Sequence, residues 1–492
     1  MQQAGRRELR HTRRTASNRE TSPSQNTADR PSSAEIAGLV EIYLTKIHGQ
    51  AHSIFHPPTL RCHLRNDSVP KALLYAMSAI GCKFSPDPQH RGMGRHLALE
   101  AKRLLQADME NVCMENIQAC ILVSMLCAGN CEISSEALFI RMGMSMAQIM
   151  KLDSVANDQT CPITVSETAR LVCWTLYLSS HRCFSGLGLP CRSDEFRPTC
   201  ELPMDELAFA SLNPDQARLE IPRKPGLCAH MVTLVQLSGP VMQLNRRISE
   251  RPVAPEELDI TMRRIEEQLR GWLDSLPADT QMTVPNLHRH QQDGLGGLFV
   301  ALHLTFHYYS ILLYFSFLEE GQGEAPTSSS TGGGDCPYID RCKHQASSFG
   351  GILHLSRQLD GCLVSYPGFS HMITVSSAVL LHTLLLGDAG EIRDARRNLN
   401  ANFEALVELQ QPWPATTAVI GRLMKFQRTC LLSTESHKLD GWMVRFLLDH
   451  AVGLEERYSA SASSHQNVED YEETSKTREL RESGRYTDFD AL

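Results

Sequence analysis

Hydrophobic residues recur along most of the chain with the spacing of helices that bury one face. Ile117, Cys120, Ile121 and the pair 124–125 fall on one side of such a helix. Another segment opens at Pro255 with Pro-Glu-Glu, which is typical of a helix start. No segment sustains the alternation of apolar and polar residues that a half-buried strand shows. The pattern therefore predicts an all-α fold built from many helices around a large core.

Polar segments mark both ends of this helical region and interrupt it once. Residues 1–35 are rich in Arg, Ser and Thr and nearly free of apolar side chains, which predicts a disordered arm. Residues 456–492 are Ser-rich and then acidic, which predicts a disordered tail. Between them we expect two helical parts, residues 36–210 and 211–455, with a flexible Gly- and Ser-rich insert at 321–337 inside the second.

One apolar segment, Phe299–Leu318, is long enough to span a membrane. Its twenty residues carry no charge, but they include two histidines and three tyrosines. We also find no comparable segment elsewhere in the sequence. We therefore interpret this segment as a buried core helix and expect no membrane partner.

Composition narrows the class of protein only slightly. The net charge of -8 is mild for 492 residues, so bulk charge does not favour a polyanion as partner. The sixteen cysteines are scattered through apolar segments, which favours free thiols in a reducing compartment such as the cytosol or nucleus. The first thirty residues are locally basic, with seven arginines against three acidic residues.

The stretch 137–203 holds the most specific order of residues in the chain. A helix with Gly143 in its interior is followed by a helix that carries Glu167, Arg170 and Trp174. Because glycine inside a helix costs about 1 kcal/mol, we expect another helix to approach closely at Gly143. Glu167 and Arg170 are three residues apart, so we expect them to pair on the helix surface or to cap a neighbour. Trp174 is expected to be a core anchor whose indole N–H needs one acceptor.

Further motifs precede and follow this stretch in a fixed order. His56 and Pro57 open a His-Pro-x-Thr segment, and Gly188 and Pro190 form a Gly-x-Pro turn after the Trp174 helix. Later, a Leu-x2-Trp-x3-Leu-Pro segment contains Trp272 and ends at Pro277. Each of these motifs is common by itself, and their order is what carries information.

This order resembles the fungal-specific transcription factor domain, also called the middle homology region, of the fungal zinc-cluster transcription factors. The resemblance covers residues 56–203 closely and 256–430 more loosely. It implies a large helical regulatory domain in a nuclear protein, and His56, Pro57, Gly143, Glu167, Arg170, Trp174, Gly188, Pro190, Trp272 and Pro277 as its structural motif positions. In that family such domains control a transcription factor through partners or a small-molecule effector.

The cysteine cluster that gives this family its DNA contact has no counterpart in the sequence. Two zinc ions held by six thiolates need two runs of Cys-x2-Cys-x6-Cys, and no Cys-x2-Cys occurs. We therefore expect no cofactor, and zinc only where an N-terminal cluster belongs to a longer form of the protein. The DNA contact is then expected to be weak or indirect, through a protein partner such as an intact zinc-cluster relative.

Two groups of residues are candidate binding sites. The arginines of the N-terminal arm (Arg6, Arg7, Arg10, Arg13 and Arg14) fit a nuclear import signal or a weak phosphate contact, and equally a solvated tail. Histidines spaced by four occur at His48, His52 and His56 and at His303 and His307. Because Pro57 stops the first series and the second lies in an apolar helix, we expect satisfied core histidines and no metal.

Known catalytic patterns are missing from the sequence. It has no Gly-x-Ser-x-Gly elbow, no phosphate-binding P-loop and no dinucleotide glycine fingerprint. We therefore expect no enzyme and favour a nuclear regulator of a pathway-specific gene set, such as a metabolic or secondary-metabolite cluster. The alternatives are a helical small-molecule sensor and an all-α enzyme, both outside transcription.

Overall fold

The computed structural model describes residues 31–50, 53–186, 196–213, 224–250, 253–319, 337–433, 475–483 and 485–487. These residues form helices joined by loops, and an isolated bridge pairs Met204 with Pro225. No strand forms within the described ranges. The all-α fold predicted from the sequence is confirmed.

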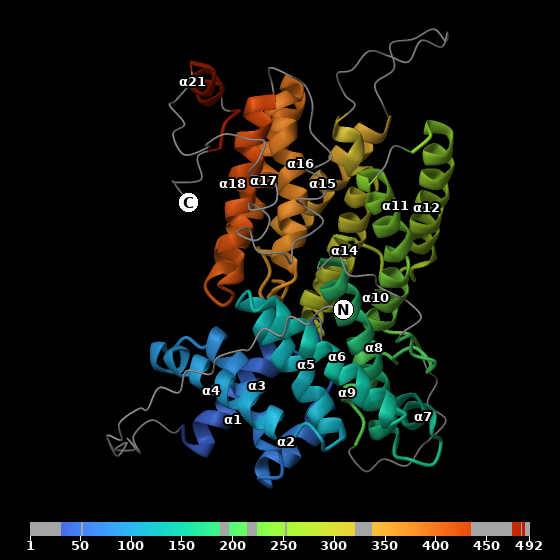
Figure 1. The fold of residues 1–492 in the computed structure, drawn as a ribbon, viewed down its shortest axis with the longest axis vertical. Coiled ribbons are helices and arrows are strands. Elements are labelled where there is room, and N and C mark those ends of the chain that lie inside the picture. Colours follow the sequence, from blue (N-terminus) through green and yellow to red (C-terminus); the bar gives the residue numbers. More distant parts are fainter. Residues whose placement is uncertain are drawn as a thin grey trace, which may run out of the picture.

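The first nine helices gather at one end of the elongated molecule (Figure 1). They are α1 (Ser33–Lys46), α2 (Pro57–Arg65), α3 (Lys71–Phe84), α4 (Pro88–Ala107), α5 (Met114–Gly129), α6 (Ile133–Ile149), α7 (Leu152–Asn157), α8 (Ile163–Gly186) and α9 (Glu206–Ala210).

The later helices extend from this group toward the other end (Figure 1). They are α10 (Leu227–Gln236), α11 (Ser238–Glu250), α12 (Pro255–Ser275), α13 (Val284–Gln292), α14 (Gly296–Tyr314), η2 (Phe315–Glu319), α15 (Pro337–Ser356), α16 (Phe369–Leu386), α17 (Ala389–Gln410), α18 (Ala415–Ser433) and α21 (Ser475–Glu482).

Local signals in the sequence account for several of the helix starts. The Ser32 hydroxyl accepts a hydrogen bond from Glu35 N, and the Glu35 carboxylate accepts one from Ser32 N, which is a capping box at the start of α1. The Asp87 carboxylate caps α4, whose first residue is Pro88. These contacts satisfy backbone N–H groups that the first helical turn leaves without partners.

Side chains from both ends of the molecule meet at its waist, and one continuous hydrophobic core runs through it. Trp413 is fully buried and lies so close to Gly129 of α5 that a Cβ there would clash with the indole ring. Its indole N–H donates to Ser365 O at 2.7 Å. The Gln50 amide accepts from Ser365 N at 2.8 Å and donates to Leu363 O at 2.9 Å. The two ends are therefore joined by specific polar contacts as well as by apolar packing.

Three helical segments are long and apolar enough to cross a membrane by length and composition: Leu227–Ile248, Gly296–Leu318 and Phe369–Leu386. The expectation of one such segment was thus wrong, because Phe369–Leu386 is more apolar than the one we singled out. The second and third segments are almost entirely buried inside the fold. As the sequence analysis proposed, Phe299–Leu318 belongs to the core.

The segments predicted to be disordered lie largely outside the described residues. That holds for most of the arm 1–35, for all but Pro337 of the insert 321–337 and for most of the tail 456–492. Within the tail the structure differs from the prediction, because Ser475–Glu482 form α21 and residues 485–487 pack against α16 to α18. The Arg396 guanidinium donates to Thr487 Oγ1 at 2.8 Å, and Gln427 donates to Thr487 O at 2.8 Å. Acidic composition did not reveal these docked residues.

Candidate functional site

Glu167 and Arg170 of α8 form a buried ion pair. Both side chains are inaccessible to solvent, and the guanidinium donates to Glu167 Oε2. Arg170 Nη2 also donates to Ala156 O at 2.7 Å, while Glu167 Oε1 accepts from Met204 N at 2.7 Å. Burial raises the pKa of Glu167, and the Arg170 charge opposes that shift. The expected pairing does occur, but inside the fold and not on the helix surface. The alternative expectation, that the pair caps a neighbour, is met as well, because Arg170 binds Ala156 O near the carboxyl end of α7.

Trp174, one turn further along α8, binds the segment 199–204, which also contains Met204. Its side chain is buried, and its indole N–H donates to Glu201 O at 2.9 Å. The ring meets that of Tyr177 edge-on, with centroids 5.6 Å apart. Asp153 adds a contact from α7, since its Oδ2 accepts from Thr199 N at 3.1 Å. Together these groups hold the segment 199–204 onto α8.

Gly143 lies where α5, α6 and α8 meet. A Cβ at this position would lie 3.1 Å from Leu176 Cδ2 and 3.2 Å from Cys120 Cβ. Contacts this short would require Leu176 or Cys120 to move by a few tenths of an ångström before a Cβ could fit. The glycine therefore permits the close helix approach that the sequence analysis anticipated.

The other motif residues have structural partners of their own. His56 precedes α2, its Nδ1 lies 2.7 Å from Thr59 Oγ1, and Pro57 opens the helix. Trp272 is buried, and its indole N–H donates to Thr233 Oγ1 at 2.9 Å. Pro277 follows α12, and its carbonyl accepts from Thr280 N at 2.9 Å. Gly188, Pro190 and the five arginines of the N-terminal arm lie outside the described residues.

The described histidines that are spaced by four residues lie within hydrogen-bonding distance of backbone or side-chain groups of the protein. His48 Nε2 accepts from Phe55 N at 3.3 Å, His303 Nε2 lies 2.9 Å from Thr280 O, and His307 Nδ1 lies 2.6 Å from Gln345 Oε1. Burial lowers the pKa of each of these imidazoles to about 4. His52 lies outside the described residues.

One group of possible metal ligands does occur in the described part of the chain. Donor atoms of Asp153, Cys173 and Cys200 lie within 4.8 Å of one another, and both thiols are buried. A structural zinc site takes four protein ligands, so this group is one short.

A cavity opens at the waist, between α8 and the helices that follow it. The centres of water molecules fit into about 100 Å³ of it, and the space between its lining atoms is about 1030 Å³ when open solvent is included. Most of its wall is apolar or aromatic. The residues that line it are Gln50, Ser53, Leu178, His181, Arg182, Cys228, Met231, Val235, Ser238, Met242, Leu298, Thr305, Tyr308, Tyr309, Tyr366, Gly368, Phe369, His371 and Met372. An apolar hollow with a few polar groups is typical of small-molecule sites.

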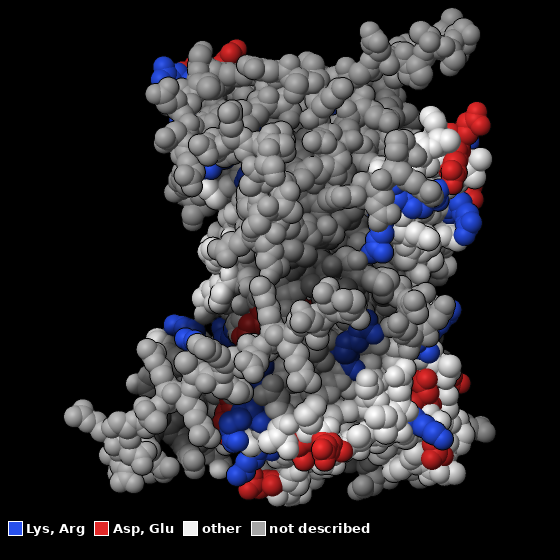
Figure 2. Space-filling model, in the orientation of Figure 1, with Lys and Arg blue, Asp and Glu red and all other residues white. Residues whose placement is uncertain are grey.

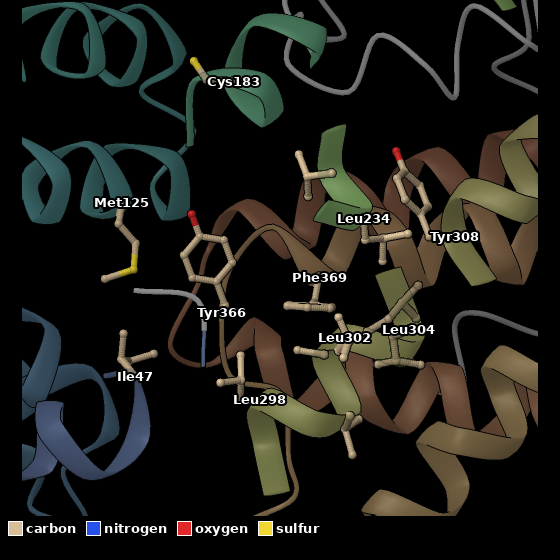
Figure 3. Packing of buried hydrophobic residues seen from close by; sticks show 14 of the residues in the cluster. Ile47, Met125, Cys183, Leu234, Leu298, Leu302, Leu304, Tyr308, Tyr366 and Phe369 are labelled. Atoms are coloured by element: carbon tan, nitrogen blue, oxygen red, sulfur yellow. The ribbon is translucent and has the colours of Figure 1, made fainter. Parts of the chain in front are cut away.

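Figure 3 shows the aromatic side chains at this place. Tyr366 lies between the two ends of the molecule, with Ile47 and Met125 on one side and Phe369 on the other. Leu298 and Tyr308 come from α14, which runs through the core beside them. Residues far apart in the sequence thus form one wall.

Arg182 is the charged residue of this lining. Its guanidinium lies over the Tyr366 ring, with Cζ 4.2 Å from the ring centroid. Gly368 leaves room for it, because a Cβ there would lie 2.9 Å from Arg182 Cδ. Burial lowers the pKa of Arg182, and the Glu136 carboxylate opposes that shift. Arg182 makes no hydrogen bond or ion pair with any residue in the described part of the chain.

Sequence reasoning missed this cavity and Arg182, although a signal was present. Arg182 is the one residue with a formal charge between Arg170 and Arg192, in an otherwise apolar and small-polar run. A lone charge in a helix that reads as buried points to a special environment. The rest of the lining comes from distant segments, so no local pattern could have assembled it.

The charged surface gives no comparable sign of a binding face. In the view of Figure 2, described side chains of both signs are interspersed over the end formed by α1 to α9. A DNA-binding face would concentrate Lys and Arg to contact phosphates. At that end of the molecule, the described surface in this view mixes the two signs.

Comparison with known proteins finds a matching domain family and several relatives. Residues 40–274 match the family described as the fungal specific transcription factor domain. An uncharacterized transcriptional regulatory protein of Schizosaccharomyces pombe is 25% identical over 332 residues, which are 60% of this chain and 33% of that protein. Another such protein of the same yeast is 20% identical over 463 residues, which are 82% of this chain and 66% of that protein.

A relative whose name includes the zinc cluster also matches. A Zn(2)-C6 fungal-type transcription factor of Fusarium oxysporum f. sp. lycopersici is 19% identical over 414 residues, 76% of this chain and 43% of that protein. The chain thus spans between 33% and 66% of the length of these relatives. This chain therefore carries the fungal specific transcription factor domain at residues 40–274, and its relatives are named as fungal transcription regulators.

Proposed function

We propose that this protein regulates a pathway-specific gene set from the nucleus, and that its helical domain responds to a small-molecule effector. The observation that carries the proposal is the domain match at residues 40–274. The names of the relatives are those of transcription regulators, which favours a role without catalysis.

The position of the cavity supports the effector role. Its lining combines residues of the matched domain, such as Arg182 and Met231, with residues beyond it, such as Tyr308 and Phe369. A ligand that contacts both parts favours the arrangement in which they close on it. Occupancy of the cavity would therefore change how the two ends of the molecule are held together.

The DNA contact is the part of this proposal that the described helices do not supply. A zinc-cluster DNA-binding protein that assembles with the chain would provide it, as would a zinc cluster joined to the same polypeptide. The Zn(2)-C6 relative supports either arrangement. The arginines of the N-terminal arm, Arg6, Arg7, Arg10, Arg13 and Arg14, are proposed to direct nuclear import.

Genome-wide chromatin occupancy of the tagged full-length chain in a fungal host tests the proposal, with co-purifying proteins identified from the same sample. Discrete peaks together with a zinc-cluster partner support a regulator that uses the DNA contact of that partner. Absence of enrichment at any locus contradicts the transcriptional role and favours a sensor or an enzyme outside transcription.

The import signal is tested separately. Replacing the five arginines of the arm by glutamine should move a fluorescently tagged chain from the nucleus to the cytoplasm. The matched control replaces the surface arginines Arg61 and Arg103, each paired with a glutamate, and should leave localisation unchanged. Nuclear accumulation of the arm variant would refute the import role.

A further inference from the structure

The charge balance of the cavity indicates the chemistry of its ligand. Arg182 contributes the formal charge of the lining, while the other polar groups are hydroxyls, an amide and imidazoles. Burial lowers the pKa of the lining residue His181 to about 4, so this imidazole is neutral at pH 7. Arg182 is therefore the permanent charge of the lining, and the Glu136 carboxylate outside the lining is near enough to act on its pKa.

The half-buried cation in this position is only partly compensated, since the Glu136 carboxylate acts on it without forming an ion pair among the described residues. Moving an ion out of water costs several kcal/mol unless a partner of opposite charge or hydrogen bonds compensate. Arginine cannot escape this cost by losing its proton within the stability range of a protein. Ring contact with Tyr366 compensates only in part, since a cation–π pair contributes about 0.5–2 kcal/mol.

The geometry also holds the guanidinium ready for a ligand. The contact with the Tyr366 ring and the close approach of the Arg182 stem at Gly368 hold the guanidinium in place. Contact with a ring occupies none of its N–H donors, and these match the two oxygens of a carboxylate. Glu167 supplies the carboxylate that pairs with Arg170, whereas at Arg182 a ligand could supply such a carboxylate.

The remaining wall defines the rest of the ligand. Leu178, Met231, Val235, Leu298 and Phe369 present apolar surface. Nucleotides and other polyanions would need several cations, whereas this wall offers one. An apolar body with a single acidic group fits best.

We propose that the cavity binds an amphipathic organic carboxylate, with its acid group on Arg182 and its apolar or aromatic body against α10, α14 and the start of α16. This inference rests on the proposed function in treating the cavity as the effector site. It assigns Arg182 as the residue that selects for an anion.

Calorimetric titration of the full-length protein with 2-naphthoate and with its neutral amide, 2-naphthamide, tests the inference. Wild-type protein should bind the acid about tenfold or more tightly than the amide, as one charge-assisted pair allows. Arg182→Gln should remove that preference, and Arg182→Lys should retain part of it. Arg103→Gln, which removes an exposed surface cation, should keep the full preference. Melting temperatures of all variants are measured alongside.

Equal affinity for acid and amide in the wild-type protein, or no binding of the acid at millimolar concentration, overturns the proposal, and neither result depends on any variant. An acid preference that survives in Arg182→Gln overturns the assignment of that residue. Binding is measured without DNA, so loss of chromatin occupancy would refute the transcriptional role and leave this result standing. A failed titration would conversely leave the transcriptional role intact.

Discussion

Two arginines twelve residues apart on α8 occupy opposite electrostatic situations. Arg170 lies in the core with Glu167 against it and Ala156 O as a further acceptor. Arg182 lines a cavity, with an aromatic ring as its contact and no ion-pair partner in the described part of the chain. The same side chain on the same helix therefore completes a structural network in one place and leaves a charge available in the other.

On this one helix, Arg170 therefore contributes to stability, and Arg182 is available for function. A paired charge cannot lose its partner without leaving the other charge buried and uncompensated. A half-buried charge without a direct ion pair carries part of its desolvation cost in the free protein, and a ligand can remove that cost. Sites of function are commonly destabilised in this way. The following predictions test the comparison in order of decreasing effect.

Breaking the buried pair should have the largest effect. Arg170→Met leaves the Glu167 carboxylate buried without its counter-ion, so we expect the free energy of unfolding to fall by about 3–5 kcal/mol in urea titrations. Glu100 and Arg103 provide a matched control, since they form an ion pair with the same i,i+3 spacing on an exposed surface. Arg103→Met should cost far less, because an exposed pair is screened by solvent. Equal losses in the two variants would contradict the structural role of the buried pair.

Truncating Trp174 should be comparably severe. Trp174→Ala removes a buried ring and the hydrogen bond to Glu201 O, so we expect a loss of about 3–5 kcal/mol in the free energy of unfolding. Trp174→Phe keeps most of the apolar contact and should cost less. An unchanged melting temperature in the alanine variant would show that Trp174 does not anchor the core.

A buried histidine, His382, is another ionisable group without a hydrogen-bond partner among the described residues, and its pKa makes the stability of the fold depend on pH. Burial, aided by the nearby Lys343 charge, lowers the pKa of His382 on α16 to about 4, and its Nδ1 has no hydrogen-bond partner among the described residues. Because the unfolded imidazole keeps its ordinary pKa of 6.5, the unfolded chain binds more protons between pH 6.5 and 4. The stability contributed by the neutral ring is present above pH 6.5 and is lost as the pH falls toward 4.

His382→Leu should abolish this loss. Relative to wild type, the variant should gain about 1–2 kcal/mol in the free energy of unfolding when the pH is lowered from 7.5 to 5. Urea titrations at the two pH values measure it. His96, which is exposed on α4, supplies the control substitution His96→Leu, for which we expect no such gain. A pH-independent difference for His382→Leu would refute the assigned titration.

Much of the fold could be predicted from the sequence, because helical periodicity and caps are local properties. The spacing of Glu167 and Arg170 also predicted that they pair. Their burial could not be predicted, since the exposed pair Glu100 and Arg103 has the same spacing. What distinguishes the two pairs is a covering segment, residues 199–204, that folds back onto α8.

The candidate site was less accessible to sequence reasoning. Its lining joins Gln50, α8, α10, α11, α14 and residues 366–372, which are brought together by tertiary packing alone. The lone charge of Arg182 was the available local signal. Residues 485–487 were misassigned for a similar reason, since their contacts with Arg396 and Gln427 leave no trace in local composition.

The most direct test of the contrast between the two arginines is the stability of Arg182→Met compared with Arg170→Met, measured by urea unfolding without ligand. Methionine retains most of the apolar stem while removing the charge. The free energy of unfolding of Arg182→Met should stay within about 1 kcal/mol of wild type or exceed it, because a half-buried cation that has no ion pair among the described residues is removed. A loss of about 3 kcal/mol or more, as expected for Arg170→Met, would show that Arg182 is also a structural ion and would contradict the account.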